Sequence, residues 1–266
     1  MTNAGPPGYS AFQLALILLA GLVLLCIAAP LASLILNTPI ADVARTAADE
    51  EVRASIWLSL WTAMAATLVA AFGALPLAWL LARRRLPASE FLSAIVDLPI
   101  VIPHSAAGIA LLGLFSREAF VGGAADTVGL RFIGDELGII AAMAFVSVPY
   151  LLHAARDGFA AVPERLERAA LNLGASPARV FFTISIPLAW RSVVSGMVLM
   201  WGRGMSEFGA VMIVAYRPMV TPILLWERYS AFGLAYARPV AVVLLGVALV
   251  TFIAARLLAG RGHAAR

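Results

Sequence analysis

The sequence predicts an all-α integral membrane protein with six transmembrane helices and one short polar helix between the fourth and the fifth. Of its 266 residues, 62% are hydrophobic and only 13% are charged, an apolar surplus that a water-soluble domain could not bury. Six apolar runs reach the length of about 20 residues that a bilayer-spanning helix needs. Each run is expected to be helical because a segment in hydrocarbon must satisfy its own backbone hydrogen bonds, and none alternates like a β-barrel strand.

The predicted spans run from Ala11 to Leu36, Ser55 to Ala82, Phe91 to Phe115, Leu137 to Ala155, Leu188 to Ala215 and Pro239 to Ala259. The first run is too long for the apolar core of a signal peptide, and no basic residue precedes it, so we assign it as a span. We expect a single transmembrane domain over residues 1–266. Residues 1–54 supply the first helix and an outer loop, residues 55–259 the core region, and residues 156–187 the loop between spans four and five.

The distribution of arginine predicts how the spans are oriented, since all nineteen basic residues are arginine. Eleven fall on one side of the predicted membrane: Arg83, Arg84, Arg85, Arg156, Arg165, Arg168, Arg179, Arg191, Arg256, Arg261 and Arg266. Seven fall on the other: Arg45, Arg53, Arg117, Arg131, Arg217, Arg228 and Arg238. Connections rich in Lys and Arg stay in the cytoplasm. We therefore expect a multi-pass protein of the cell membrane, the inner membrane where there are two, with both termini cytoplasmic.

Composition and motifs also exclude several functions. The net charge of +4 is small and the arginines are scattered, which argues against nucleic acid as a partner. The single cysteine, Cys26, excludes an intrachain disulfide and a cysteine metal cluster, and we predict no metal site and no catalytic residue. The chain has no G-x-x-x-x-G-K-[ST] phosphate loop, so we expect it neither to bind nor to hydrolyse ATP.

The polar interruption at residues 163–176 reads as a short amphipathic helix followed by a turn. Apolar residues recur at helical spacing in Leu166, Ala169, Ala170 and Leu173. Pro163 suits the first helical position, and Gly174 suits the position just past the end. Such a helix could lie on lipid headgroups. Its polar face carries two Glu and two Arg, a balance that weakens attraction to anionic lipid and favours a protein partner.

The same segment resembles the cytoplasmic loop of the permease subunits of binding-protein-dependent ABC importers. The family pattern is E-A-A, three residues, G, nine residues and I-x-L-P, and this chain has Arg168-Ala169-Ala170, Gly174 and Ile184-Ser185-Ile186-Pro187. Two positions depart from it: Arg168 replaces the glutamate, with Glu167 beside it, and Ile186 replaces the leucine. The resemblance implies that this loop couples to the ATPase through Glu167, Arg168, Ala169, Ala170, Gly174, Ile184 and Pro187. Because Arg168 stands where the pattern has glutamate, the resemblance leaves open which residue makes the polar contact with the ATPase, and Glu167 is a candidate.

The resemblance also implies a type I permease fold and a set of partners. Two copies of a separate ATP-binding subunit would hold ATP and Mg, whereas this chain would bind no cofactor and act as a transport subunit without an ATP site. A second copy of the chain would complete the pathway, since one half cannot enclose a channel. An extracytoplasmic oxyanion-binding protein would deliver substrate, and membrane lipid would surround the spans.

Several intramembrane residues are candidates for a translocation path: Asp97, Pro99, Pro103, His104, Arg203, Ser206 and Glu207. The prolines either only shape the bundle or mark a broken helix that lines a path. The second alternative is supported by Asp97 and His104, because ionisable groups are costly beside lipid and face protein or water. Arg203 and Glu207 are four residues apart, hence on one helical face where they can neutralise each other. That pair either locks two helices together or offers transient positive charge to a passing anion.

The substrate class is implied by further resemblance. The string Ser206-Glu207-Phe208-Gly209-Ala210, together with residues 97–104 and 215–219, is similar to the oxyanion branch of the family and most similar to its molybdate/tungstate permeases. A sulfate or thiosulfate permease is the alternative within the class, because no residue here reads the central atom. A secondary anion transporter would need an internal repeat and intramembrane ion ligands. A non-transporting membrane scaffold is the third alternative.

Overall fold

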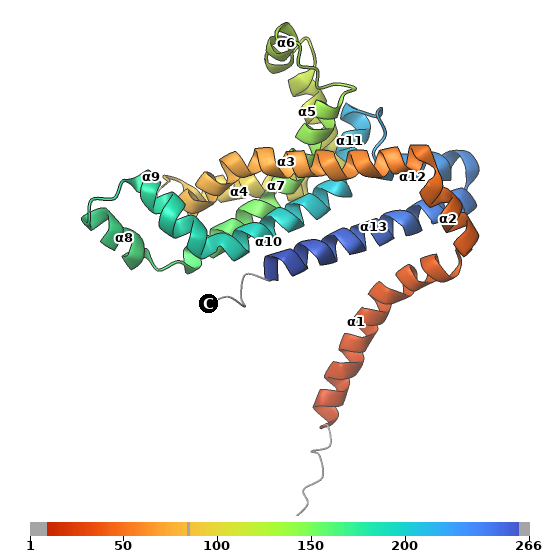
Figure 1. Cartoon of the computed structure of the whole chain (residues 1–266), viewed down its shortest axis with the longest axis horizontal. Coiled ribbons are helices and arrows are strands. Elements are labelled where there is room, and N and C mark those ends of the chain that lie inside the picture. The colour runs from red at the N-terminus through yellow and green to blue at the C-terminus, as the bar shows by residue number, and fades with distance from the viewer. Residues whose placement is uncertain (1–9, 84–85, 261–266) are drawn as a thin grey trace, which may run out of the picture.

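The computed structural model describes residues 10–83 and 86–260, with side chains described as far as residue 254. All regular structure in these residues is helical (Figure 1), as predicted. The helices are α1 (Ala11–Leu36), α2 (Ile40–Ala48), α3 (Glu50–Ala82), α4 (Ser89–Val101), α5 (His104–Phe115), α6 (Phe120–Thr127), α7 (Glu136–Ala161), α8 (Glu164–Asn172), α9 (Pro177–Val180), the π-helix η1 (Phe181–Ser185), α10 (Ile186–Met205), α11 (Gly209–Val214), α12 (Thr221–Phe232) and α13 (Leu234–Gly260).

Within the described residues, five helices are long and apolar enough to cross a membrane, and α4 with α5 makes a sixth if the bent pair counts as one span. The helix α1 has the predicted bounds, and α3, α7 and α13 extend beyond theirs. Helices α2, α6 and α12 were not predicted, because they are short and fall in the connections. Some of the arginines on which the predicted orientation depends lie outside the described residues: Arg84, Arg85, Arg261, Arg266 and the side chain of Arg256.

The third predicted span, from Phe91 to Phe115, consists of two helices, α4 and α5. Helices α4 and α5 meet at an angle of 110°. The break follows from Pro103, because a residue that precedes proline is driven out of the helical region. Ile102 accordingly adopts extended angles, with φ −71° and ψ 144°. Of the two alternatives for this segment, the structure therefore shows a broken helix.

The fifth span also ends earlier than predicted. Helix α10 stops at Met205, and residues 206–208 form a non-helical link to the short helix α11. Arg203 and Glu207 therefore do not share a helical face, although their side chains do meet. At its other end α10 is longer than predicted, because α9, η1 and α10 form one continuous rod from Pro177 to Met205.

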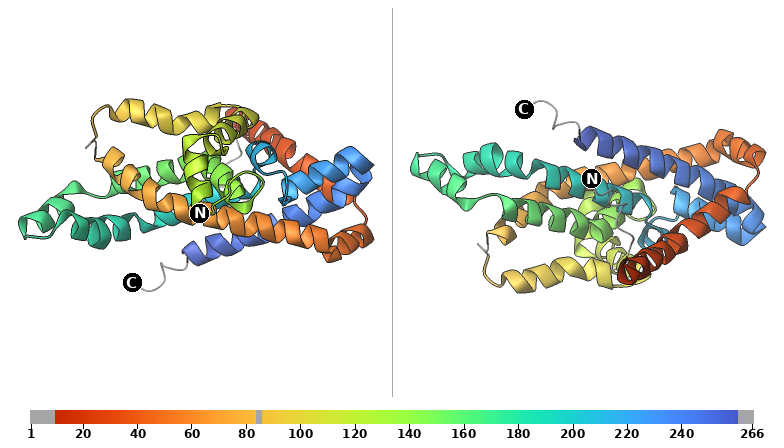
Figure 2. Two further views of the ribbon diagram at one scale, coloured as in Figure 1. Left: turned by 90° about the horizontal axis from the view of Figure 1, so that it is seen from above. Right: turned by 90° about the horizontal axis from the view of Figure 1, so that it is seen from below.

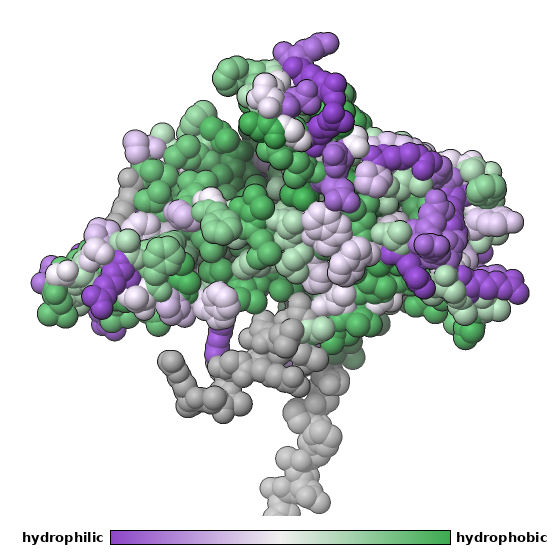
Figure 3. Space-filling model, turned by 45° about the horizontal axis from the view of Figure 1, so that its top comes forward, coloured by the Kyte–Doolittle hydropathy of each residue, from purple (hydrophilic) through white to green (hydrophobic). Residues whose placement is uncertain are grey.

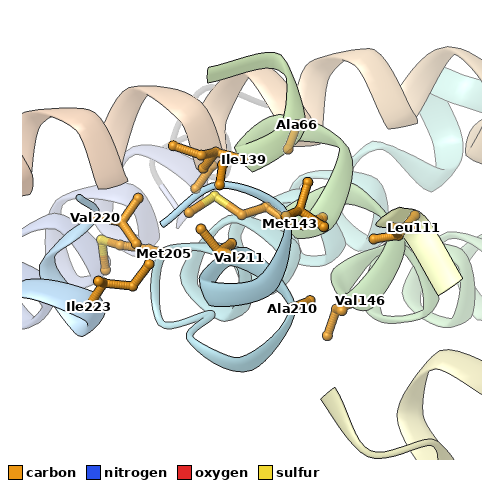
Figure 4. Close-up of a cluster of buried hydrophobic side chains, with 14 of the residues drawn as sticks. Ala66, Leu111, Ile139, Met143, Val146, Met205, Ala210, Val211, Val220 and Ile223 are labelled. Atoms are coloured by element: carbon orange, nitrogen blue, oxygen red, sulfur yellow. The ribbon is translucent and has the colours of Figure 1, made fainter. Parts of the chain in front are cut away.

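The core forms around α7, which packs against both α3 and α10. Toward one end of the bundle, α11 is enclosed by α5 and α7, and Figure 4 shows Val211 of α11 close to Met143 of α7. Both side chains are fully buried. Burial of the short helix α11 in this cluster fixes the position of the 206–208 link that precedes it.

Close approach of α7 and α10 depends on glycine. A Cβ atom at Gly158 would lie 2.4 Å from Cβ of Ser192 on α10. Small residues at helix contacts are a common means of bringing transmembrane helices together. We expect Gly158→Val to lower the thermal unfolding temperature in detergent, at a cost of about 1–3 kcal/mol for overpacking. Gly73→Val is the matched control, since no atom lies within 4 Å of a Cβ built there; equal loss in both variants would contradict the packing argument.

The surface is apolar over a broad area and polar at its extremities. In Figure 3 hydrophobic residues cover most of the visible face, and hydrophilic residues gather at the α8–α9 end, on the α6 projection and at the end with α2 and α12. Helix α1 has no buried residue and leaves the bundle, and α4 lies at its margin (Figure 2). This distribution is that of a membrane protein with two polar ends.

Candidate functional site

The predicted amphipathic helix is present as α8, at the end of the bundle where α3 finishes (Figure 1). Pro163 is the N-cap residue and lies one position before the helix, not at its first position. Gly174 has a φ of +88°, which disfavours any residue with a Cβ. The amide of Ala175 donates to the carbonyl of Ala170, and that of Gly174 to the carbonyl of Leu171. These two bonds make a Schellman motif, so Gly174 ends the helix as expected.

The residues of α8 divide between an exposed and a buried side. Leu173 is 89% exposed, and Leu166 and Ala169 are exposed as well. Arg168 is also exposed and pairs with Glu164 one turn earlier. The side chain of Glu167, by contrast, is only 2% exposed. The apolar stripe predicted from sequence therefore faces away from the bundle, and an acidic residue faces inward.

Glu167 is held by three side chains from two other elements. Arg83, at the end of α3, donates from Nη2 to Oε1 at 2.8 Å and from Nε to Oε2 at 3.1 Å. Trp79 donates from Nε1 to Oε1 at 3.2 Å, and Ser185 donates from Oγ to Oε1 at 2.7 Å. Arg83 also donates to the carbonyl of Val162 at 3.1 Å. The cluster ties α8 to α3 and to the start of α10.

Burial raises the pKa of the Glu167 carboxyl, but the hydrogen bonds from Arg83, Ser185 and Trp79 outweigh it and hold the pKa below its ordinary value of 4.5. The carboxylate is thus ionised at neutral pH and fully engaged inside the protein. The side chain of Glu167, one candidate for the polar contact with an ATPase, therefore anchors α8 internally. Sequence reasoning missed Arg83, Trp79 and Ser185 as partners because two of them are more than eighty residues away.

The end of the motif explains how Ser185 reaches this cluster. Ile184 and Ser185 lie in η1, and Pro187 follows at the second position of α10. Proline lacks an N–H and its ring crowds the carbonyl four residues earlier. A wider π-turn directly before it accommodates this crowding within a continuous helix. The spacing of the motif thus places Ser185 opposite Glu167.

A second polar cluster lies where the two broken helices meet. His104 Nδ1 is 2.8 Å from Glu207 Oε2, and Arg203 Nη2 is 3.0 Å from the same oxygen. Arg203 Nη2 also lies 3.0 Å from both ring nitrogens of His104. The imidazole tautomer that donates through Nδ1 to this oxygen leaves Nε2 to accept from Arg203. The structure therefore brings together three of the predicted path residues.

The other carboxylate oxygen of Glu207 binds the first turn of α11. Its Oε1 accepts a hydrogen bond of 2.9 Å from the amide of Ala210, in the manner of a cap. Ser206 is exposed, and its hydroxyl donates to the carbonyl of Arg203 at 3.0 Å. The carboxylate of Glu207 is thus satisfied at both oxygens while only 1% of its side chain is exposed.

Asp97 does not join that cluster. Its Oδ1 lies 2.6 Å from Nε2 of His153 on α7, a contact that links the marginal helix α4 to the bundle. Pro99 is buried within α4, and Pro103 caps α5. His153 was not predicted as a partner, although an ionisable residue inside a predicted span is a signal that could have found it.

The arginines of the opposite end are largely paired. Arg228 of α12 donates to Asp49 at 2.7 Å and to Glu51 at 3.0 Å. The hydrogen bond from Arg228 holds the pKa of Asp49 below its ordinary value. This pairing fastens α12 to the beginning of α3, so the charge of Arg228 is compensated within the chain.

The fold of this chain is one that solved ABC transporters share. Its structure resembles the bacterial ABC transporter that imports alginate, solved also with an alginate-bound periplasmic protein, with a TM-score of 0.71 over 94% of this chain and 96% of that one. It also resembles the inward-facing methionine transporter MetNI, with a TM-score of 0.61 over 79% of this chain and 93% of that one. Both share 16% sequence identity with this chain, so the likeness concerns the fold.

The chain belongs to the family of binding-protein-dependent transport system inner membrane components, whose sequence profile matches residues 74–261. It is 41% identical to the molybdate/tungstate transport permease WtpB of Thermococcus kodakarensis, over 90% of this chain and 92% of that protein. It is 42% identical to WtpB of Pyrococcus furiosus, over 82% and 83% of the two chains. A probable sulfate transport permease of Chlorokybus atmophyticus is 29% identical over 78% and 74%. The resemblance seen in the motif is confirmed, and the chain is a multi-pass transport subunit.

Proposed function

We propose that this chain is the membrane permease subunit of an ATP-driven importer of molybdate or tungstate. The relatives named for that substrate share 41–42% identity with it. The observation that carries the mechanical part is that α8 exposes apolar residues at one end of the bundle while its buried Glu167 is bonded to α3 and η1. A sulfate or thiosulfate permease is the alternative, supported by the more distant relative at 29%.

The partner at α8 is a separate ATP-binding subunit, present in two copies, which holds ATP and Mg and performs the hydrolysis. Exposed residues of α8, chiefly Leu166, Ala169 and Leu173, contact it, and Arg168 lies beside them. Closure of the ATPase pair moves α8, and the Glu167 cluster carries that movement to α3 and α10. Ala170, Gly174, Ile184 and Pro187 keep the helix and its turn in position for this contact.

The remaining parts of the assembly follow from the same proposal. A second copy of the chain completes the path, and an extracytoplasmic binding protein delivers the oxyanion at the end with α2 and α12. Exposed arginines of the loop after α7, such as Arg165 and Arg179, lie at the opposite end from Arg45, which favours a cytoplasmic α8 and cytoplasmic termini. Residues 1–54 supply the first helix and an outer loop, and residues 55–259 the permease core.

The translocation path runs past the two breaks in the bundle. Its residues are Asp97, Pro99, Pro103, His104, Arg203, Ser206 and Glu207. The two broken helices support this placement, since irregular backbone inside a membrane is tolerated where protein or a water-lined cavity surrounds it. Selectivity for the oxyanion rests mainly with the binding protein, because a path that held a dianion tightly would not release it.

The proposed contact of α8 with the ATPase is tested by introducing a charged residue among the exposed apolar residues of α8. In Leu173→Arg we expect the ATPase to co-purify about ten- to a hundredfold less tightly, because burial of a leucine contributes about 1.5–3 kcal/mol. The measurement is the affinity of the purified permease for its ATPase in nanodiscs. Val128→Arg, at an exposed apolar residue near α6, is the matched control and should bind normally. Unchanged binding by Leu173→Arg would overturn the assignment of α8.

A further inference from the structure

In the cluster of Arg203, His104 and Glu207, the first two residues resemble a binding site for an anion, and the carboxylate of Glu207 is the anion that they bind. We propose that Arg203 and His104 form a transient binding site for a tetrahedral oxyanion, and that the Glu207 carboxylate occupies this site while no substrate is present. The inference rests on the proposed function and assigns a role to each member of the cluster. In this role Glu207 is an internal competitor that the arriving oxyanion must displace from Arg203.

The first support is the way in which Glu207 is bound. Its Oε2 is contacted by both Arg203 Nη2 at 3.0 Å and His104 Nδ1 at 2.8 Å. One oxygen of a tetrahedral oxyanion can accept from two donors in the same way, and an arginine suits a carboxylate and an oxyanion alike. Donors that satisfy the carboxylate are therefore also suitable donors for the oxyanion.

The second support is the difference in exposure within the cluster. The side chain of Arg203 is 23% exposed and that of His104 is 39% exposed, whereas that of Glu207 is 1% exposed. Arg203 also borders a groove of about 370 Å³ between α10 and α13, whose other lining residues are uncharged. Both donor side chains are thus partly exposed, and the groove leads to Arg203, whereas the carboxylate that they bind is buried.

The third support is that the backbone holds the cluster together. His104 is the first residue of α5, after the break at Pro103, and Glu207 lies in the break between α10 and α11. A Cβ atom at Gly209 would lie only 2.7 Å from Cβ of His104, so glycine is required for this approach. The ionisable residues Asp97 and His153 pair with each other instead, so they do not take up the charge of this cluster.

An internal competitor explains how a cationic site inside a membrane can release a dianion. With Glu207 in place, the positive charge of Arg203 is compensated, and an arriving dianion gains only the difference between two sets of contacts. Conduction needs sites that bind strongly enough to admit an ion and weakly enough to release it. Return of the Glu207 carboxylate to Arg203 assists that release.

The test is binding of tungstate to the purified permease–ATPase complex in nanodiscs, without a binding protein, measured by titration calorimetry. We expect Glu207→Gln to bind tungstate about tenfold or more tightly than the unmodified complex, since the competing charge is removed. Arg203→Gln added to Glu207→Gln should abolish that gain. Glu118→Gln, which removes an exposed acidic charge near α6, is the matched control and should bind as the unmodified complex does.

Equal tungstate affinity in the unmodified complex and in Glu207→Gln would overturn the inference, as would an undiminished gain in the double variant. If Glu207→Gln fails to fold, Glu207→Asp keeps the charge but shortens its reach to Arg203. It should then show a smaller gain in affinity, and no gain would again overturn the inference. The proposed function fails separately, if the unmodified chain does not assemble with an ATPase or support ATP-driven uptake.

Discussion

Replacement of Glu167 by alanine is expected to abolish ATP-driven uptake and to lower the free energy of unfolding by about 3–5 kcal/mol, because it leaves the buried Arg83 without its anionic partner. Four hydrogen bonds to the carboxylate are lost at once. Helix α8 then keeps its exposed face but loses its connection to α3 and η1. We therefore expect the ATPase still to bind and hydrolyse ATP while transport fails, measured as the ratio of uptake to hydrolysis in proteoliposomes.

The control for this variant lies on the same helix. Glu164 forms an exposed pair with Arg168, and such pairs are screened by water and contribute little. Glu164→Ala should retain both stability and uptake. A similar loss in the two variants, or full coupling in Glu167→Ala, would show that the buried cluster does not transmit movement.

The same cluster predicts a dependence of stability on pH. The folded-state pKa of Glu167 lies below its ordinary value of 4.5, so the unfolded chain takes up the proton first as pH falls. The contribution of this group to stability is therefore complete above about pH 4.5 and is lost as pH falls through the lowered pKa. Comparison of acid unfolding for the unmodified chain and for Glu167→Ala isolates this contribution, and the two curves should converge at low pH.

The second large effect is expected at the turn that follows α8. Gly174→Pro should abolish uptake while the chain still inserts into the membrane. Proline fixes φ near −65°, whereas Gly174 has a φ of +88°, and proline also removes the amide that donates to Leu171. Forcing the backbone of residue 174 out of the left-handed region costs about 1–3 kcal/mol. It also changes the direction of the segment that leads from α8 to η1.

Asparagine is the matched substitution at this position, because it is the residue other than glycine that most readily adopts left-handed angles. Gly174→Asn should keep most of the uptake measured in proteoliposomes. Normal transport by Gly174→Pro would mean that the geometry of this turn does not matter for coupling.

Hydropathy alone predicted where helices occur but not where they break. Helix α1 matched to the residue because its apolar run is bounded sharply on both sides. The third and fifth predicted spans stay apolar on average across their breaks, despite His104 in the one and Glu207 in the other, so a hydropathy window does not detect the breaks. Pro103 signalled the first break. The second has no proline, and it depends on Glu207, which caps α11 through a contact that forms only in the folded protein.

At the candidate site, too, local sequence patterns predicted the helix but not its contacts with distant parts of the chain. The local signals of Gly174 and of the apolar stripe were sufficient to predict α8 and its end. The inward direction of Glu167 was not predictable from the helix, because it depends on Trp79 and Arg83, which come from a span far away in the sequence. Likewise the pairing of Asp97 with His153 depends on how α4 leans against α7.

Ser185 and Arg203 belong to the same unbroken rod, which runs from residue 177 to 205. They are eighteen residues apart, about five full helical turns or roughly 27 Å, and so they lie along nearly the same line on its surface. Each is bonded to a glutamate outside the rod, Ser185 to Glu167 of α8 and Arg203 to Glu207 just beyond the end of α10. A tilt or twist imposed on the rod at Ser185 is thus transmitted to Arg203 in the same direction, because the helix between the two residues is continuous.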